Sequence, residues 1–325
     1  MRMRQSGRWA LILPGMLLCL ACSKTGSGPG NNGGGGNNNG GQTALGSGTI
    51  FVQWATSGIQ RIDLSTGAES TVMPENTSLH DYWISQNGKQ MLTSENAPGT
   101  DYDANLYTLS NLSDGTIVSQ FKYYPTSGDY TSPTLSPDGT MIAVIPTYDD
   151  GIVILDLKGH VLHNLTSFNG KPFKEMLAWM PDNTLLFVTA DGLFRTNAGF
   201  TTGTLVQQFN FTSWGQIAAS PDGTRIALAG GNHIWMINAD GSNLTQVTTS
   251  SQVEAYPVFS PDSKYLLVGA NYRESMAASF LWDLRIIPAD GGLYNVDQGA
   301  SSHVIPVIPK GASTVQSGDG SMFWR

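Results

Sequence analysis

The stretch SPDSKYLLV, Ser260–Val268, decides the fold because copies of it recur along the chain. In the clear copies proline presets φ at the second residue of a tight turn and aspartate accepts hydrogen bonds from the backbone that follows it. Gly or Asn, which tolerate a positive φ, follow the aspartate in most of them. Apolar runs lie on both sides, so each copy predicts a β-hairpin. The other copies, of which the last two are degenerate, are Ser220–Leu228, Ser136–Val144, Met180–Val188, Gln86–Leu92 and Gly318–Phe323.

The copies recur at a regular spacing. Their turn positions are Asn87, Asp138, Asp182, Asp222, Asp262 and Asp319. The steps between these positions are 51, 44, 40, 40 and 57 residues. A period of about 40–45 residues, with four strand-sized segments in each unit, is typical of a propeller blade. The sequence therefore predicts an all-β fold, a six-bladed β-propeller of four-stranded antiparallel blades.

Closure of the ring involves both ends of the repeat region. Three strands are predicted in the first unit, at Thr49–Trp54, Ile59–Leu64 and Glu69–Val72. The last copy, within Ser313–Arg325, supplies only a first hairpin, so we expect it to meet the amino-terminal strands and remove exposed sheet edges. The closing blade then has four or five strands. A seven-bladed ring that uses the long segment Asn271–Ile308 is the alternative.

The pattern "SPDG…IA…IWMINADGSNLTQV", which spans Ser220–Val247, resembles the TolB-type, WD-like propeller repeat, in which LT closes each unit. The resemblance covers most of Thr49–Arg325 and implies the propeller architecture. It implies no single activity, because this repeat occurs in translocation proteins, peptidases, lyases and uncharacterised lipoproteins. No Gly-x-Ser-x-Gly elbow is present, so serine peptidase activity is not expected. TolB also has an amino-terminal α/β domain that we do not expect here, so its role in a cell-envelope complex is not carried over.

Residues 1–21 have the pattern of a targeting segment. Arg2, Arg4 and Arg8 form a basic region, and the apolar run Trp9–Leu20 is too short to span a bilayer. The segment ends at Leu-Ala-Cys and resembles a bacterial lipoprotein signal, which implies that Cys22 becomes the lipidated first residue. An ordinary secretory signal with cleavage nearby is the alternative.

A lipid on Cys22 would hold the protein on a membrane without a spanning helix. The residue after it is Ser23 rather than Asp, which by the enterobacterial sorting pattern favours the outer membrane; its periplasmic or surface face is left open. Residues 22–48 are rich in Gly and Asn and predict a flexible tether, with a reach of roughly 25–30 Å. Residues 49–325 form the propeller domain.

Composition limits the partners of the mature protein. Without residues 1–21 the chain keeps 14 basic and 25 acidic residues, a formal net charge of −11, which argues against nucleic acid or anionic lipid as an electrostatic partner. Both cysteines lie in or at the end of the targeting segment, so the domain has no disulfide, thiolate metal site or cysteine nucleophile. We expect a monomer that contacts the membrane through its anchor alone.

The sequence predicts no metal site and no cofactor. The pair His160 and His163 has the spacing of a helical ligand pair, but a strand places the two side chains on opposite faces. Asp101–Asn105 has the first ligand spacing of a calcium loop, yet Leu106 and Leu112 stand where such a loop needs Gly and an acid. Whether calcium binds there is left open.

The first strand of each blade lines the central channel of a propeller, and the loops that lead into these strands form one mouth. Counting back six to eight residues from each turn position therefore predicts a binding funnel. Its residues are His80, Asp81, Tyr130, Thr131, Lys174, Glu175, Trp214, Gln216, Glu254 and Tyr256. The insertion Tyr272–Ala278, between two strands of one blade, is a second candidate contact surface.

Two functions remain open from the sequence. The first is a membrane-anchored binding or scaffold protein of the cell envelope that recognises a protein or glycan, without catalysis and with no catalytic residue assigned. The second is a carbohydrate-active enzyme, a lyase or glycoside hydrolase, with Asp81, Glu175 and Glu254 as its carboxylates. Such an enzyme should show two carboxyl groups about 5–10 Å apart, or a metal cluster.

Overall fold

The computed structural model describes residues 47–54, 56–100, 103–125, 131–145, 151–174, 176–274, 280–297, 301 and 303–325. The chain divides into two units, and all described residues belong to the second, Gly41–Arg325. The predicted targeting segment, Cys22 and almost all of the tether lie outside the described residues. Within the described ranges, no helix is long and apolar enough to cross a membrane.

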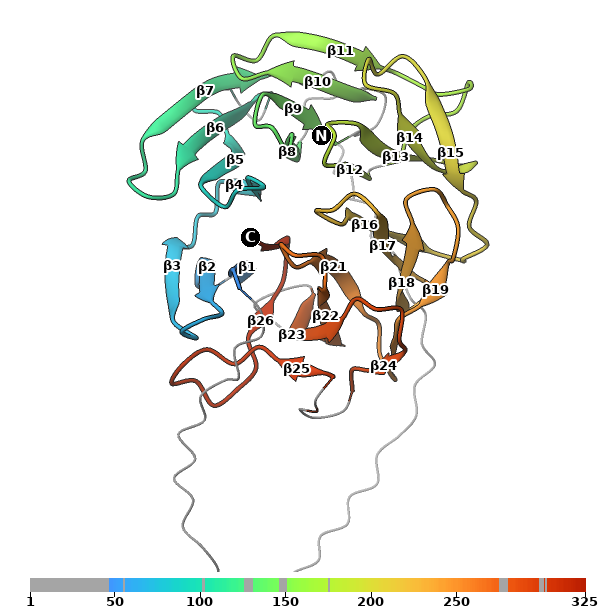
Figure 1. Ribbon diagram of the computed structural model, residues 1–325. Helices are drawn as coiled ribbons and strands as arrows, with labels where there is room; N and C mark the ends of the chain where they lie inside the picture. Colours follow the sequence, from blue (N-terminus) through green and yellow to red (C-terminus); the bar gives the residue numbers. More distant parts are fainter. Residues whose placement is uncertain are drawn as a thin grey trace, which may run out of the picture. The chain divides into compact units, whose positions relative to one another are not determined.

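The described strands form six blades arranged in a ring (Figure 1). Blade 1 is β27 (Met322–Trp324), β1 (Thr49–Trp54), β2 (Gly58–Asp63) and β3 (Glu69–Met73). Blade 2 is β4 (Leu79–Ile84), β5 (Gln90–Asn96), β6 (Asn105–Asn111) and β7 (Ile117–Tyr123). Blade 3 is β8 (Pro133–Leu135), β9 (Met141–Val144), β10 (Ile152–Asp156) and β11 (Val161–Leu165).

The second half of the ring repeats this order. Blade 4 is β12 (Leu177–Trp179), β13 (Leu185–Thr189), β14 (Gly192–Thr196) and β15 (Gly203–Gln207). Blade 5 is β16 (Trp214–Ala219), β17 (Arg225–Gly230), β18 (His233–Asn238) and β19 (Thr245–Gln246). Blade 6 is β21 (Ala255–Phe259), β22 (Tyr265–Arg273), β23 (Leu281–Pro288) and a divided outer strand, β25 (Ile305–Pro306) and β26 (Ser317–Gly318). A short parallel pair, β20 (Thr248–Thr249) and β24 (Tyr294–Asn295), links blades 5 and 6.

The predicted fold class is confirmed, and the seven-bladed alternative is wrong. The segment that it required, Asn271–Ile308, supplies the end of β22, then β23 and β25, all within blade 6. The outer strand of blade 6 is divided because β25 and β26 both pair with β23 while the chain between them makes an excursion. The long spacing before the last turn position reflects that excursion and not an additional blade.

The recurrent motif forms the turn between the first and second strands of blades 2 to 6, and its serine organises that turn. In blade 6 the Ser260 hydroxyl donates to Asp262 Oδ1 (2.7 Å) and accepts the N–H of Tyr265 (3.0 Å). Asp262 Oδ1 also accepts the N–H of Lys264 at 3.1 Å. In blades 2 to 6 the residue after the turn position has a positive φ, between 61° and 73°, and this includes Ser263 at 61°. The serine thus satisfies a backbone donor that the tight turn would otherwise leave unpaired.

The Met180 copy lacks this serine, and a threonine hydroxyl from β14 of the same blade takes its role. Thr196 on β14 accepts the N–H of Leu185 at 2.9 Å, the bond that the serine hydroxyl accepts elsewhere. Successive turns also contact one another across blades. The N–H of Asp138 donates to Asn183 Oδ1 (3.2 Å), and that of Asp222 donates to Ser263 Oγ (3.1 Å). The turns therefore help to set how neighbouring blades pack.

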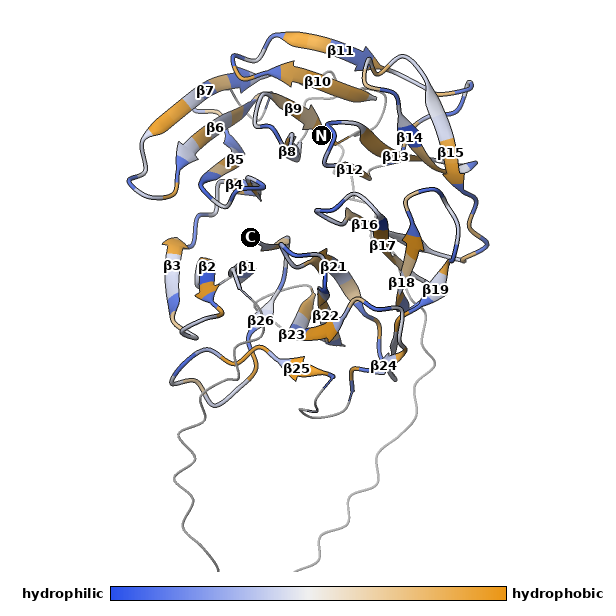
Figure 2. Cartoon of the chain, viewed as in Figure 1, coloured by the Kyte–Doolittle hydropathy of each residue, from blue (hydrophilic) through white to orange (hydrophobic). Residues whose placement is uncertain are grey.

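Hydrophobic packing fills each of the six interfaces between blades. Strand β13 shows how a continuous apolar run serves two interfaces at once, since alternate side chains point to opposite faces of a sheet. Leu185 and Phe187 pack against blade 3, whereas Leu186 and Val188 pack against blade 5. The outer strands are different: Figure 2 shows apolar segments on β7 and β11, where Ile117 and Val161 are 58% and 59% exposed.

Ring closure in blade 1 joins the two ends of the repeat region. Strand β27 is the innermost strand and pairs antiparallel with β1, with Phe51 opposite Phe323. Reciprocal backbone bonds link Thr49 and Arg325 beyond that pairing. Trp324 is fully buried between blades 1 and 6, and its indole N–H donates to the Ser47 carbonyl at 3.3 Å. The closing blade has four strands.

One detail of the predicted closure is wrong. The degenerate copy Gly318–Phe323 does not form a hairpin between first and second strands, because Asp319 lies between β26 and β27, before the innermost strand. In blade 1 the first and second strands, β27 and β1, are not joined by a hairpin. The two strands meet instead at Arg325 and Thr49, where the other blades have the turn. The last segment contributes a single strand because its hairpin partner, β1, comes from the other end of the repeat region.

Ser220→Ala tests the role of the turn hydroxyl. Ser220 is fully buried, and its loss leaves the N–H of Arg225 without its acceptor, so we expect the free energy of unfolding to fall by about 1–3 kcal/mol. Denaturant titration measures this. Ser242→Ala is the matched control, since Ser242 makes the same serine–aspartate bond in an exposed turn and should change stability by less than about 0.5 kcal/mol. Equal effects would contradict the assigned role.

Trp324→Ala tests closure. Removing this fully buried side chain should cost about 3–5 kcal/mol in unfolding free energy, because it leaves a cavity between the first and last blades. The aromatic control is Tyr124→Ala, since Tyr124 is 61% exposed and should have little effect. A loss below about 1 kcal/mol for Trp324→Ala would mean that closure does not hold the ring.

Candidate functional site

A cavity of about 380 Å³ lies at the centre of the ring and is lined by the innermost strand of every blade. Its size falls within the range of small-ligand sites, roughly 300–1,000 Å³. Asp81 and Ser321 lie at one end, where the chain enters the innermost strands; we call this the loop end. Gln86, Pro221 and Arg325 lie at the other, which we call the turn end. The cavity therefore runs along the channel that the sequence predicted.

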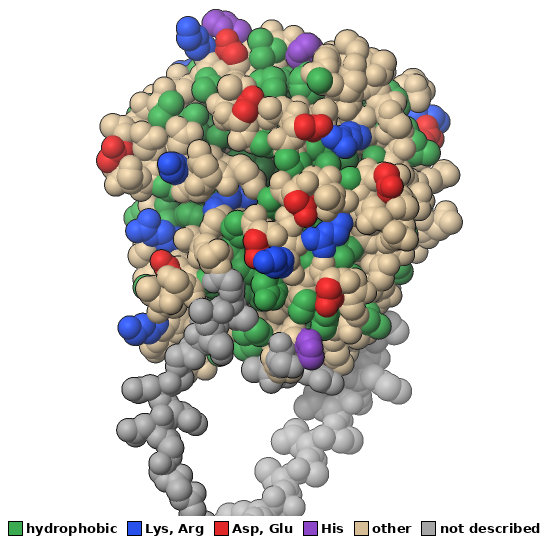
Figure 3. Space-filling model, in the orientation of Figure 1, with side chains coloured by type: hydrophobic (Ala, Val, Ile, Leu, Met, Phe, Trp, Pro, Cys, Tyr) green, Lys and Arg blue, Asp and Glu red, His purple; other side chains and the backbone are tan. Residues whose placement is uncertain are grey.

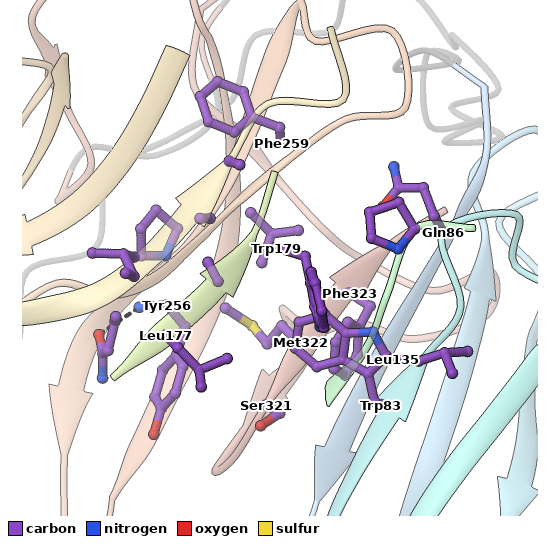
Figure 4. A pocket seen from close by; sticks show the side chains of 18 of the residues that line it. Trp83, Gln86, Leu135, Leu177, Trp179, Tyr256, Phe259, Ser321, Met322 and Phe323 are labelled. Carbon is purple, nitrogen blue, oxygen red and sulfur yellow. Dashed lines mark hydrogen bonds between the residues drawn. The ribbon is translucent and has the colours of Figure 1, made fainter. Parts of the chain in front are cut away.

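Aromatic side chains form much of the cavity wall, and Figure 4 shows them converging from several blades. The rings of Trp83 and Phe323 meet edge to face with centroids 5.0 Å apart. Trp179 is held by hydrogen bonds from its indole N–H to the backbone carbonyl (3.2 Å) and the hydroxyl (3.1 Å) of Thr134. Phe259 lies on a further innermost strand. These rings offer flat apolar surfaces to a ligand.

One position of the repeat supplies the ring of side chains at the loop end. It lies six residues before the turn position, and its members in blades 2 to 6 are Asp81, Ser132, Met176, Gln216 and Tyr256. All except Ser132 line the cavity, and the hydroxyl of Ser132 interacts with the Asp81 carboxylate. Ser321 supplies the corresponding hydroxyl in blade 1 and donates to Asp81 Oδ1 at 3.1 Å.

A local backbone irregularity aims two of these side chains. Gln216 and Tyr256 have φ values of 50° and 51°, and the pairing register of β16 and of β21 shifts at these residues. A bulge of this kind re-aims a side chain, and such backbone is sparsely populated by residues other than glycine. A hydrogen bond from the N–H of Tyr256 to Gln216 Oε1 (2.8 Å) connects the two, as Figure 4 shows.

Asp81 is the one side-chain carboxylate among the described residues that lines the cavity. Burial raises its pKa, although the hydroxyls of Ser132 and Ser321 and the N–H of Tyr82 (2.8 Å) favour the ionised form and oppose this shift. Burial also raises the pKa of Tyr256, and the charge of Asp81 contributes to that rise. In its ionised form Asp81 is therefore a source of negative potential at the loop end.

Arg325 is the cation of the turn end. Its Nε and one terminal nitrogen donate to the Ile84 carbonyl at 3.2 and 3.1 Å, and the other terminal nitrogen donates to its neighbour Trp324 at 3.2 Å. The guanidinium also lies 5.2 Å from the centroid of the Phe323 ring. Burial lowers the pKa of Arg325 to about 10, so it stays protonated at neutral pH. Among the described residues it makes no ion pair.

Of the ten predicted funnel residues, Asp81, Gln216 and Tyr256 line the cavity. His80 instead approaches the side-chain oxygens of Asn96 (2.9 Å) and Asn105 (3.1 Å), within blade 2. Thr131 is buried against the Tyr107 hydroxyl and does not line the cavity. Tyr130 and Glu175 lie outside the described residues.

The remaining three predicted residues lie around the cavity rather than in its lining. Lys174 is exposed. Trp214 packs edge to face on Phe209 with centroids 4.6 Å apart. Glu254 is buried, with Oε2 3.2 Å from His233 Nδ1 and also bonded to the Thr248 hydroxyl. Its second oxygen is buried and has no hydrogen-bond partner within the described part of the chain.

The sequence count missed the aromatic walls, Ser132, Met176 and Arg325. Ser132 and Met176 could have been found, because they occupy the same repeat position as Asp81, Gln216 and Tyr256. In blades 5 and 6 a bulge aims the side chain at that position into the cavity, whereas the prediction took neighbouring positions as well. Arg325 does not belong to the repeated motif, so the repeat could not predict it. Its position in the cavity follows from ring closure alone.

The structure describes some of the residues that the sequence analysis considered as metal ligands. Asp101 and Tyr102 lie outside the described residues, and Asn105 is buried with its side-chain oxygen facing His80 and the N–H of Thr131. His160 pairs with Asp156 at 2.8 Å, while His163 packs on the Phe200 ring. Across the described residues there is no group of three or more His, Cys, Asp or Glu that could hold a metal ion.

No family model matches the chain, and no curated protein matches it significantly. Solved structures do. TolB from Acinetobacter baumannii superposes with a TM-score of 0.60 at 18% identity, over 85% of this chain and 66% of that chain, which is just under two thirds of it. Putative TolB from Agrobacterium tumefaciens gives 0.56 at 18% identity, over 86% and 96%. Hydrazine synthase from Kuenenia stuttgartiensis gives 0.50 at 14% identity, over 78% and 81%. The resemblance to the TolB-type propeller is thereby confirmed for the fold.

Asp81→Asn tests the electrostatics of the loop end. Because the folded-state pKa of Asp81 is raised above its ordinary value of 3.8, the stability that protonated Asp81 contributes is complete below that value. It is lost as the pH rises through the folded-state pKa. The unfolding free energy of the wild type should therefore fall relative to that of Asp81→Asn as the pH rises from 4 to 8. A difference that does not change with pH would contradict the raised pKa.

Proposed function

We propose that this chain is a non-catalytic binding protein of the cell envelope that docks a partner protein on the loop end of its propeller. The observation that carries the proposal is the ring of loop-end side chains defined above, to which each blade contributes one residue. The other positions of the repeat form the turns or pack between the blades. The experiment below distinguishes a protein partner from a glycan partner.

Strand direction supports the choice of face. In antiparallel blades, the connections between blades and the hairpins between second and third strands emerge on the same side. Lys174 lies on the connection between blades 3 and 4, and Tyr272 is the last residue but one of β22, the second strand of blade 6, so both belong to the loop end. The predicted insertion and the funnel thus share one face, although residues 275–278 of the insertion lie outside the described ones.

The surface is suited to reversible docking. Figure 3 shows one face of the ring, on which acidic and basic side chains are interspersed among hydrophobic ones and form no single charged patch. At the base of the insertion, Phe280 is 51% exposed and packs against Tyr272 and Trp282. Aromatic residues that are partly exposed and supported from behind are favoured as anchors of protein interfaces.

The envelope location is part of the proposal. The lipoprotein-like segment that ends at Cys22 and the Gly- and Asn-rich tether support a domain held on a lipid anchor, with outer-membrane sorting favoured by Ser23. The likeness to TolB propellers fits an envelope protein.

No described feature favours the enzyme alternative over binding. Of its three carboxylates, Asp81 lines the cavity, Glu254 is buried in contact with His233, and Glu175 lies outside the described residues. An enzyme of that kind should show a second carboxyl group about 5–10 Å from Asp81, or a metal cluster. Activity of the full chain on envelope polysaccharides is the assay for this alternative.

Pull-down from native envelope membranes with mass spectrometry tests the proposal. We expect a reproducible protein partner, and about fivefold less of it with Lys174→Glu, because a reversed charge at the rim disfavours association. Lys158→Glu, in a turn at the opposite face, is the matched control and should retain the partner. Cys22→Ala should move the chain out of the membrane fraction. Recovery of glycan alone, or equal loss with both lysine variants, would overturn the proposed docking face.

A further inference from the structure

The central cavity contains one acidic and one basic side chain that do not meet. Asp81 lies at the loop end and Arg325 at the turn end, and within the described residues neither forms an ion pair. Arg325 is bonded to the carbonyl of Ile84, three residues after Asp81 on the same strand. A strand advances about 3.3 Å per residue, so the two groups are separated by about 10 Å along the channel.

The environment of each charge leaves room for a partner. Arg325 donates only to neutral carbonyl oxygens, and its remaining N–H groups are available to an oxyanion in a cavity where screening by water is weak. A buried guanidinium without a side-chain ion pair is costly, and a bound carboxylate would lower that cost. At the other end, Asp81 accepts bonds from Ser321 and Tyr82 on Oδ1 and also interacts with the Ser132 hydroxyl. A carboxylate has about four lone-pair sites, so it can still accept a bond from a ligand donor.

The wall between the two charges is apolar and aromatic. Trp83, Trp179 and Phe323 line it, together with aliphatic residues of the innermost strands. A ligand that fits must therefore be charged at both ends, with the anion toward Arg325, the donor toward Asp81 and an apolar middle. An extended peptide advances about 3.3–3.6 Å per residue, so three residues span the separation.

We propose that the channel binds a short free peptide of about three residues, with its carboxylate at Arg325, its ammonium at Asp81 and its central side chain against the aromatic wall. This site shares Asp81 with the ring of side chains at the loop end, but it extends through the interior of the ring to Arg325 and needs no partner protein. Free ends on both sides of the ligand are essential to it.

Isothermal titration calorimetry of the full chain at pH 7 with the probe Ala-Phe-Ala tests the inference. Two matched probes are the same peptide with a carboxyl-terminal amide and the same peptide with an acetylated amino terminus. We expect each modified probe to bind at least about tenfold more weakly than the free peptide, because each leaves one buried charge unpaired. Equal binding of all three probes, or no binding of the free peptide, would overturn the proposal.

Protein variants assign each end of the peptide to one residue. Arg325→Gln should weaken binding of the free peptide at least tenfold and abolish the affinity difference between the free peptide and the peptide amide. Asp81→Asn should abolish the affinity difference between the free peptide and the acetylated peptide. Arg61→Gln and Asp114→Asn change exposed residues outside the cavity and should leave all affinities unchanged. If Arg325→Gln does not fold, Arg325→Lys keeps the charge and should bind the acid in preference to the amide. A preference that survives in Arg325→Gln would contradict the assignment.

Because these measurements use purified protein and a synthetic peptide, their failure leaves the docking proposal intact. Conversely, an empty pull-down from membranes does not affect the peptide affinities. The two proposals therefore fail separately.

Discussion

The pairing of β27 with β1 is the constraint on which the rest of this structure depends. Each blade buries both faces against its neighbours, so an open ring would expose the apolar faces of the first and last blades to water. The backbone bonds between Thr49 and Arg325 and the buried Trp324 close that gap. Closure also has a chemical consequence, since it brings Arg325 into the central cavity. The architecture and the candidate site thus share one cause.

Most of the fold could be predicted from the sequence because one local interaction recurs. A buried serine, a proline-preset turn and an aspartate repeat at nearly constant spacing, and each turn must lie between the first and second strands of a blade. The prediction was wrong for Gly318–Phe323, where similar letters lie before the innermost strand. Local turn chemistry cannot show which strand will pair across the closure, because that pairing joins residues at opposite ends of the repeat region.

The candidate site was less predictable, for a different reason. Counting residues from each turn of the repeat locates a residue along a strand to within one or two positions. A shift of one position, however, turns its side chain to the other face of the sheet. The bulges at Gln216 and Tyr256 decide that question and leave no mark in the sequence pattern. Thr131 and Glu254 therefore turned out to be buried in hydrogen bonds away from the cavity. Arg325 could be assigned only once closure was known.

Hydrogen exchange of the native protein, resolved by residue, tests closure most directly and needs no substitution. If β27 and β1 complete the ring, the amides of Phe51 and Phe323 should exchange only through global unfolding, as slowly as those of Leu186 in blade 4. If β27 instead exchanges by local opening, orders of magnitude faster than the interior strands, the ring is held without it and the place of Arg325 in the channel is not secured.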